Sequence, residues 1–431
     1  MSIRLWFKHI NVKAISIVAL AATFYCYEFF LRVSPSVLTH ELMHFYQVGA
    51  GTLGSIVACF FLAYTIMQIP AGLLGDHYGP RRILVFAACL CAIATALFTL
   101  SNHVGIGMLT RFMIGFAASF AYIAPLMLAA RWCQPQHFPI ICGLIQMMGC
   151  IGAMISGAPV VYLSYRFGWQ NTLQYAACIG LGLALLYALF IQDTPKEKTK
   201  NVKPLQLSQI SQHHFKRLKQ ICQNPQSWSI ALIGFATWAP ISIFAELWGV
   251  PFLEQRFHLS THTAAMLIQS TWWGIAIGGP LLGYLSARFQ NRKKPLMFGL
   301  YTSLIVSLMI LYAPLNMLSL QVALFLLGIG AASQCITFGL VRDIHPVAIA
   351  GTAVGFNNMA VIMGGIICQP LVGFILEYYW QGTVQHGAHV YTALHYQWAL
   401  LTMPVCSIIG IVACTGWLKE THGQNLLERS L

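Results

Sequence analysis

The feature that most constrains this chain is a succession of apolar segments, each about as long as a bilayer is thick. Segments such as 14–31, 53–74 and 173–191 are mostly apolar, and a helix needs about 20 such residues to cross the hydrocarbon core. Only 8% of the 431 residues are charged, against about 25% in soluble domains. One segment could be a targeting peptide, whereas a dozen indicate a polytopic membrane protein.

The segments predict helices, not strands. Every backbone N–H and C=O in a bilayer core must be paired within the protein, which leaves only helices and closed barrels. Barrel strands are short and alternate in polarity, but these segments are continuously apolar. The expected fold class is an all-α membrane protein with twelve transmembrane helices at 14–37, 51–74, 83–100, 104–130, 138–163, 170–191, 228–253, 262–287, 296–313, 318–341, 350–377 and 397–418.

The net charge of +13 is distributed as in a membrane protein, not as in a nucleic-acid-binding protein. With the N-terminus in the cytoplasm, 20 of the 24 Lys and Arg residues fall in the tails and the even-numbered connections. Cytoplasmic loops carry such an excess, so both termini are expected in the cytoplasm. The short loops favour a bacterial inner (cytoplasmic) membrane, with an endomembrane location as the alternative.

A polar linker separates two sets of six helices. The expected domains are an N-terminal bundle (1–191), a cytoplasmic linker with an amphipathic helix at 205–222 (192–227), and a C-terminal bundle (228–431). Shifting the sequence by 211 positions superimposes the two sets. The pairs that coincide include Gly72 with Gly283, Arg81 with Arg292, Arg82 with Lys293, Arg131 with Arg342, Gln146 with Asn357, and Pro159 with Pro370. Such repeats place a solute site between the halves, near the bilayer midplane.

The stretch between the second and third helices reads GLLGDHYGPRR (72–82). It resembles the G-x-L-a-D-r-x-G-r-r loop of the major facilitator superfamily, and the resemblance covers the whole chain, including a degenerate second copy after the eighth helix. Gly79 permits a tight turn, and Asp76 can accept hydrogen bonds at a helix N-terminus. The resemblance implies a secondary transporter that works by alternating access.

The same resemblance implies that this loop is a conformational latch that stabilises the outward-open state. The latch residues are Gly72, Asp76, Gly79, Arg81 and Arg82, with the arginines that end the fourth and tenth helices, Arg131 and Arg342. In the second copy Ala287 replaces the Asp and Gln290 replaces the Gly, so a weaker latch is expected there. The alternative is that these residues only anchor a cytoplasmic turn.

The fourth helix contains RFMIG (111–115), which resembles the R-x-x-x-G segment of the same family. Burying a charge in an apolar helix costs a few kcal/mol, so Arg111 is expected to face a cavity or a partner; snorkelling from the helix start is the alternative. The fifth helix has no Gly-Pro pair of the kind found in proton-antiporting drug exporters of the family. That absence disfavours drug efflux without excluding it.

Two acidic residues lie well inside the spans, Glu28 and Glu246. Glu28 and Arg32 are four apart, so they share a helix face and can form an ion pair. Glu28 is the first candidate for proton coupling, with a static ion pair as the alternative. Glu246 is the second candidate, with snorkelling to the outer interface as its alternative.

Arg32 and Arg111 in a low-dielectric cavity would favour a solute that carries a carboxylate or phosphate. Uncharged residues on cavity-lining helices complete the candidate substrate site: Tyr25, Gln269, Trp273, Asn357 and Asn358. For each of them, helix packing or an interfacial position is the alternative.

No metal, cofactor or enzymatic activity is expected. The 13 cysteines show no CxxC pair, and the histidines between the last two helices (His386, His389 and His395) match no metal motif. No phosphate-binding loop or nucleophile elbow occurs.

The expected function is proton-coupled secondary transport of a small organic anion or zwitterion, such as an amino acid, peptide or carboxylate. The alternatives are drug or siderophore efflux and a non-transporting membrane receptor. The expected partners are the solute, protons and the lipid bilayer. A functional monomer is expected, because the fold needs no partner.

Overall fold

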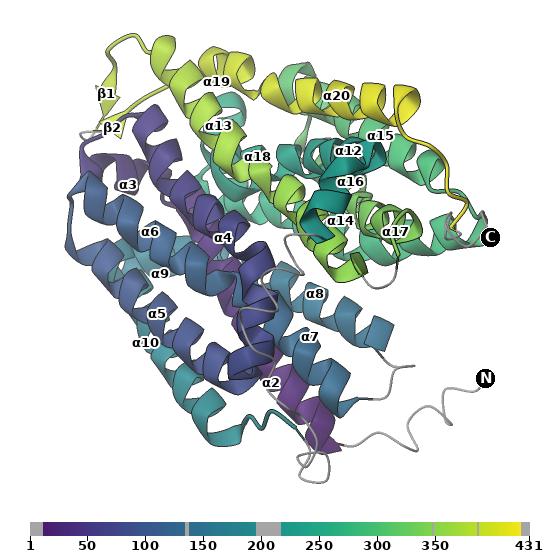
Figure 1. Ribbon diagram of the computed structural model, residues 1–431. Coiled ribbons are helices and arrows are strands. Elements are labelled where there is room, and N and C mark those ends of the chain that lie inside the picture. Colours follow the sequence, from purple (N-terminus) through teal and green to yellow (C-terminus); the bar gives the residue numbers. More distant parts are fainter. Residues whose placement is uncertain (1–11, 134–137, 195–216, 347–348, 386–387, 424–431) are drawn as a thin grey trace.

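A computed structural model describes residues 12–133, 138–194, 217–346, 349–385 and 388–423. Within these ranges, eleven helical segments are long and apolar enough to cross a membrane. The one crossing not among these eleven is α14 (Thr261–Arg288), the eighth in chain order. Its 28 residues include several polar side chains. Figure 1 shows the helices gathered into two bundles, with the first and the last described helices beginning and ending on the same side. The predicted twelve-helix fold in two six-helix bundles is confirmed.

Ten helical elements form the N-terminal bundle. They are α2 (Val12–Val33), η1 (Ser34–Val37), α3 (Thr39–Tyr46), α4 (Ala50–Tyr78), α5 (Pro80–Leu100), α6 (Val104–Ala118), α7 (Phe120–Trp132), α8 (Phe138–Ile155), α9 (Ala158–Phe167) and α10 (Trp169–Phe190). The pairs α6 with α7 and α8 with α9 each make one crossing.

The C-terminal bundle has the same plan. Its helices are α12 (Pro225–Ile243), η4 (Phe244–Trp248), α13 (Gly249–Phe257), α14, α15 (Lys293–Tyr312), α16 (Met317–Ala332), α17 (Gln334–Asp343), α18 (Ala350–Tyr378), α19 (Ala393–Leu400) and α20 (Thr402–Gly416). Between α18 and α19 lies an antiparallel hairpin of β1 (Val384–Gln385) and β2 (Ala388–His389), in which Val384 pairs with His389.

The fourth and tenth crossings are each interrupted by a serine, and the two serines lie within three residues of equivalent positions in the internal repeat. Ser119 separates α6 from α7, and Ser333 separates α16 from α17. Each serine hydroxyl donates to the carbonyl oxygen three residues earlier, at 2.7 Å in both cases. A hydroxyl that competes for a backbone acceptor in this way loosens the helix locally.

Helices of opposite bundles approach closely where one of them carries glycine. Along the contact of α4 with α18, a Cβ on Gly373 would lie 2.3 Å from the carbonyl oxygen of Ala50, and one on Gly54 would lie 2.8 Å from that of Gln369. The second long contact between the bundles joins α8 with α14. Small residues allow backbones to meet in this way within membranes.

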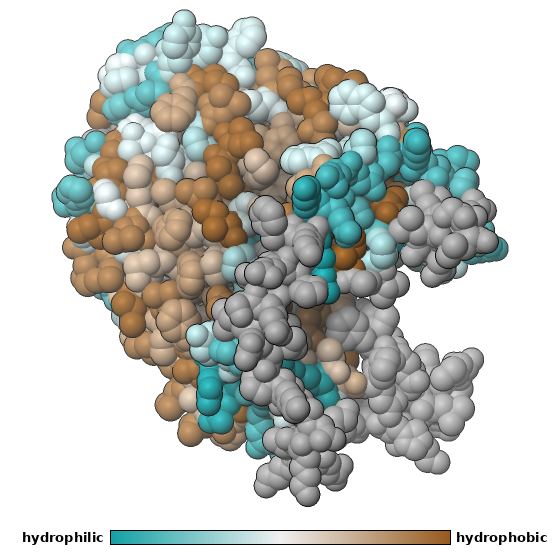
Figure 2. Space-filling view, in the orientation of Figure 1, coloured by the Kyte–Doolittle hydropathy of each residue, from teal (hydrophilic) through white to brown (hydrophobic). Residues whose placement is uncertain are grey.

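The outside of both bundles is covered by large apolar side chains, and Figure 2 shows this surface over the N-terminal bundle. Leu100, Leu109, Ile179, Phe190 and Leu318 are all exposed. In water such a surface would be an aggregation liability, whereas in a bilayer it contacts lipid.

Part of the predicted linker lies outside the described residues, which resume at 217 with a short helix to 223. The expectation of an amphipathic helix at 205–222 therefore concerns mostly residues beyond the described ranges. His386 also lies outside them.

Candidate site in the cavity between the two bundles

A cavity of about 760 Å³ lies between the two bundles. Gly72 near the end of α4, Arg342 near the end of α17 and Gly351 at the start of α18 line it, so it reaches the end of the molecule where α2 begins and α20 ends. We call this the inner end and the opposite one the outer end. Figure 2 shows the molecule hollowed at the inner end. The cavity between the bundles is therefore open at the inner end.

Arg32 lines the deep part of this cavity and is 3% exposed. Its guanidinium lies about 5 Å from the ring centroids of Phe29 and Phe61 and 5.9 Å from that of Tyr64. Aromatic faces stabilise a cation by their quadrupole. The planar fork of donors of a guanidinium matches the geometry of a carboxylate.

Two carboxylates stand beside this guanidinium. Arg32 Nη2 lies 3.0 Å from Glu246 Oε1, and Arg32 Nη1 lies 3.9 Å from Glu28 Oε1. Glu28 comes from the same helix, as its spacing predicts, but Glu246 belongs to the other bundle. Both carboxylates are 0% exposed. The interpretation of Glu246 as a residue that snorkels to the outer interface is wrong.

An irregular turn brings Glu246 to this position. Pro240 lies inside α12 and cannot donate a backbone hydrogen bond. Directly after this helix, residues 244–248 form a single π-helical turn, and Glu246 is its central residue. Such turns shift the faces of a helix and are frequent at functional sites. Regular helical spacing from the sequence could not predict which way Glu246 points.

Arg111 has a different role from the predicted one, because it does not line the large cavity. Its side chain contacts the end of α2 instead, where Arg111 Nη1 donates to the carbonyl oxygen of Leu31 at 2.9 Å. In an intact helix this oxygen would accept from residue 35, but Pro35 has no N–H. Arg111 thus satisfies an acceptor that the break in the first crossing leaves free, and its charge acts on Glu28.

The other predicted substrate residues divide into two groups. Tyr25 and Asn358 line the cavity. Tyr25 donates to Gln146 at 3.3 Å, and Asn358 donates to Gln68 of the other bundle at 2.7 Å.

The second group lies away from the cavity. Asn357 is fully buried and donates to Thr337. Gln269 lines a cavity of only about 10 Å³ and donates to the carbonyl oxygen of Met154. Trp273 is 55% exposed and faces outward.

Several cavity residues were not predicted. They are Tyr64, Gln68, Tyr122, Gln146, Trp238 and Gln334. Gln68 and Gln334 carry the same signal as the Asn357–Asn358 pair, since each is an amide within a long apolar run. That signal could have identified them.

In the predicted latch loop, Gly79 has a φ of 81° and forms the turn between α4 and α5. Asp193, just after α10, accepts from the N–H of Arg81 at 2.8 Å, and the Arg81 side chain donates to the carbonyl oxygen of Ala188. The side chain of Asp76 is outside the described part. Arg82 is exposed, and Arg131 is half-buried. The latch role itself remains a proposal.

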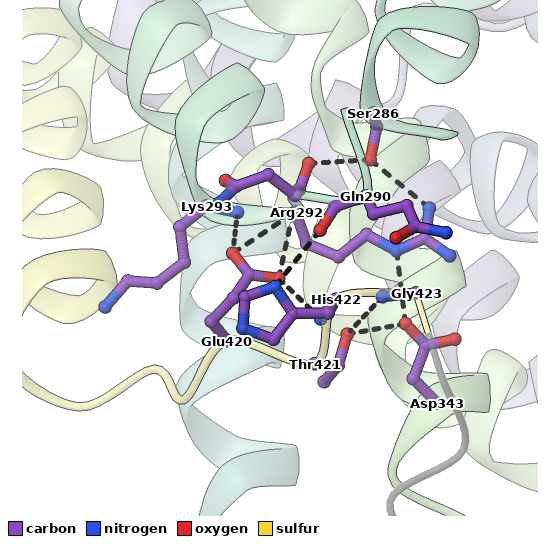
Figure 3. Close-up of polar contacts among 10 residues, drawn as sticks. Ser286, Gln290, Arg292, Lys293, Asp343, Glu420, Thr421, His422 and Gly423 are labelled. Atoms are coloured by element: carbon purple, nitrogen blue, oxygen red, sulfur yellow. Dashed lines mark hydrogen bonds and ion pairs between the residues drawn. The ribbon is translucent and has the colours of Figure 1, made fainter. Parts of the chain in front are cut away.

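The second copy of this loop is held by a network at the start of α15 (Figure 3). Glu420 accepts from the N–H groups of Arg292 and Lys293 at 2.9 and 2.8 Å. Arg292 Nε contacts Asp343 Oδ2 at 3.1 Å, and Thr421 donates to the same oxygen at 2.6 Å. In both bundles a carboxylate that follows the sixth helix caps the N-terminus of the third.

Comparison with known proteins decides the family. The major facilitator superfamily model matches residues 17–268 and 241–430. The chain belongs to the major facilitator superfamily. Its fold is similar to that of a bacterial homologue of the human lysosomal transporter Spinster, crystallised in an inward-facing and unoccupied conformation. The TM-score is 0.77 with 14% identity, over 97% of this chain and 98% of the other.

Members of the superfamily with similar sequences are named as transporters of organic acids. The probable sulfoacetate transporter SauU of Cupriavidus necator is 24% identical over 80% of this chain and 83% of its own length. The probable galactarate/D-glucarate transporter GarP of Escherichia coli K12 is 23% identical over 80% of this chain and 84% of its own. This superfamily member is therefore a multi-pass membrane transporter of a small solute and not an enzyme.

Proposed function

We propose that the protein imports a small organic anion together with protons. The observation that carries this proposal is the ion pair of Arg32 with Glu246, which joins the two bundles at a residue that lines the cavity. A solute carboxylate that binds Arg32 takes the place of Glu246 and so acts on both bundles at once. Alternating access requires a solute that has different contacts in the two states.

The lining of the cavity supports an anion over a zwitterion. Arg32, Arg217 and Arg342 line it, and no Asp or Glu does so among the described residues. A zwitterion would leave its ammonium group without an anionic partner, whereas a carboxylate or sulfonate has a guanidinium fork to bind. The amides and tyrosines offer hydrogen bonds to hydroxyl groups. The names of SauU and GarP, with sulfoacetate and sugar diacids, agree with this choice.

The charges around Arg32 support coupling to protons. Arg32 and Arg111 balance Glu28 and Glu246, so the buried group is neutral when all four are ionised. A bound monoanion would add one uncompensated charge at low dielectric, which is costly. One proton on Glu28, whose carboxylate oxygens accept no hydrogen bond from the described residues, restores the balance. Glu28 is thus the proposed proton acceptor, and Glu246 is the group that the solute displaces.

The direction of transport follows from the proposed orientation. The excess of Lys and Arg at the inner end supports a cytoplasmic position for that end and for both termini. A solute that is carried together with inward-moving protons would then leave the cavity through its inner end into the cytoplasm. In a bacterium the membrane is the inner membrane, across which protons flow inward.

Uptake into proteoliposomes tests the proposed substrate class. With acid outside, we expect accumulation of labelled galacturonate, glucarate or sulfoacetate, and none of galactose, which lacks the carboxylate. Arg32→Gln should reduce uptake at least a hundredfold, because a charge-assisted bidentate contact of about 3 kcal/mol is lost. Arg32→Lys should keep part of it. Uptake of a neutral sugar or a cationic drug in preference to every organic acid would contradict the proposal.

A further inference from the structure

The outer end of the molecule is closed by side chains of the C-terminal bundle that cap a helix of the N-terminal one. The N–H of Ala50, the first residue of α4, donates to Glu377 Oε2 at 3.1 Å and to the hydroxyl of Tyr391 at 2.9 Å. That hydroxyl in turn donates to Glu377 Oε2 at 2.7 Å. A carboxylate here satisfies free backbone donors and meets the positive end of the helix dipole.

The preceding residue shows how closely the two bundles meet. A Cβ on Gly49 would lie 2.0 Å from Glu377 Oε2. Any other residue at this position would push the carboxylate away from α4. Glycine at position 49 is therefore needed for this contact.

Two histidine side chains at the outer end each lie beside a carboxylate. His389 Nδ1 lies 3.0 Å from Glu377 Oε1, and the His389 ring stacks on Trp380 with centroids 3.6 Å apart. His389 belongs to β2, and this strand packs against α3 of the N-terminal bundle.

The second imidazole bridges the bundles directly. His40 Nε2 of α3 lies 3.3 Å from Glu254 Oε2 of α13. The hydrogen bond to Glu254 raises the pKa of His40, which partial burial alone would lower, and the charges of Glu254 and Glu41 raise it further. Of the other elements that pack against α3, β2 brings His389, whereas η1 and the first two turns of α4 (50–57) carry no titratable side chain.

We propose that the His40–Glu254 pair and the Glu377–Tyr391 cap of α4 form an outer latch, which protons on the outer side close. With His40 charged, an imidazolium–carboxylate pair holds α3 against α13 and keeps the two bundles together at the outer end. With His40 neutral, only a weaker hydrogen bond remains. The inference rests on alternating access in the proposed function, but it concerns residues outside the solute cavity.

The direction of the pH effect follows from the raised pKa of His40. A group whose pKa is higher in the closed state than in the open state stabilises the closed state at low pH. The stabilisation is complete below the unperturbed value of about 6.5 and is lost as the pH rises through the pKa of the closed state. An acidic outer side thus closes the latch, and a pH above the raised pKa of His40 releases it.

Hydrogen–deuterium exchange of the protein in nanodiscs tests the latch, because the N–H of Ala50 donates to Glu377 and Tyr391 in the latch and exchanges when these hydrogen bonds open. After correction for the intrinsic pH dependence of exchange, peptides that contain Ala50 should exchange about two- to fivefold faster at pH 8 than at pH 6, as expected for a partly exposed ion pair. His40→Lys, with a permanent charge, should remain protected at pH 8. His40→Gln and Glu254→Gln should exchange at the faster rate at both pH values.

His44→Lys is the matched control, because His44 is exposed on the same helix and has no carboxylate partner among the described residues. It should behave as the wild type. Peptides from the inner end of α10 serve as a reference for intact folding in every variant. Equal exchange of His40→Lys and His40→Gln at pH 8, or no pH dependence in the wild type, would overturn the latch. Because the readout needs no solute, failure of anion transport would leave this result standing.

Discussion

Pro35 has no N–H to give to the carbonyl oxygen of Leu31, and Arg111 donates to that oxygen from another helix. This pairing explains why a buried arginine is tolerated in the fourth crossing. It also fixes the end of α2 at Val33, one residue after Arg32 in the chain. We therefore regard Arg111 as a residue that positions the site, not one that touches the solute.

A double substitution tests this role. Arg111→Met leaves a buried carbonyl without a donor and should cost about 1–3 kcal/mol of stability, seen as a lower melting temperature by tryptophan fluorescence. In a Pro35→Ala background the backbone N–H of residue 35 can reach Leu31 instead, so the same substitution should cost at least about 1 kcal/mol less. An equal cost in both backgrounds would mean that Arg111 does not serve this carbonyl.

Neighbouring residues show where the sequence was informative and where it was not. Paired amides in an apolar helix predicted polar contacts at Asn357 and Asn358, and both make them. Only Asn358 lines the cavity, because adjacent residues of a helix point about 100° apart. Helices that are apolar all round carry little indication of which face meets the cavity, so Trp273 and Gln269 could not be placed.

At the inner end, both bundles cap a helix terminus in the same way. A carboxylate that follows the last helix of the bundle accepts hydrogen bonds from the N-terminus of its third helix. Asp193 caps α5, and Glu420 caps α15. Burial alone would raise the pKa of Glu420, but hydrogen bonds from the N–H groups of Lys293, Arg292 and His422 outweigh it and hold this pKa below its usual range.

Glu420→Gln should therefore destabilise the protein in a pH-dependent way. A carboxyl whose pKa is lowered by folding contributes stability above its unfolded value of about 4.3, and this contribution disappears as the pH falls through the folded value. We expect a loss of about 0.5–1 kcal/mol at pH 7 that vanishes in acid, measured by thermal unfolding. Lys419→Gln, at an exposed neighbouring side chain, is the control. A difference that persists at pH 3 would show that packing, not charge, is responsible.

The positions of the membrane-crossing helices were predicted better than the breaks and irregular turns within them. Apolar length fixes where a helix crosses the bilayer, so every predicted crossing agrees to within a few residues with one observed helix or with two or three consecutive helical elements. The π-helical turn at 244–248 is different, because it depends on how α12 packs after Pro240. Without that turn, the contact of Glu246 with Arg32 could not be foreseen.

For the whole molecule, the structure combines an open inner end with a closed outer end. The solute cavity reaches the inner end, while Glu377, Tyr391 and the His40–Glu254 pair join the bundles at the outer end. Between the two ends, Arg32 and Glu246 form an ion pair across the interface. A rocking motion of one bundle against the other would have to break the outer contacts and rearrange this central one. The sequence predicted two halves, but contacts between them depend on long-range packing.

The central claim is that a solute anion on Arg32 is accompanied by a proton on Glu28. Its most direct test is the number of protons that enter proteoliposomes with each galacturonate, read from a pH-sensitive dye in the lumen and from the labelled solute. We predict one proton per monoanion in the wild type. Glu28→Gln should still exchange labelled for unlabelled solute, but its transport should no longer move protons or follow a pH gradient. Undiminished proton movement with galacturonate in Glu28→Gln would contradict the account.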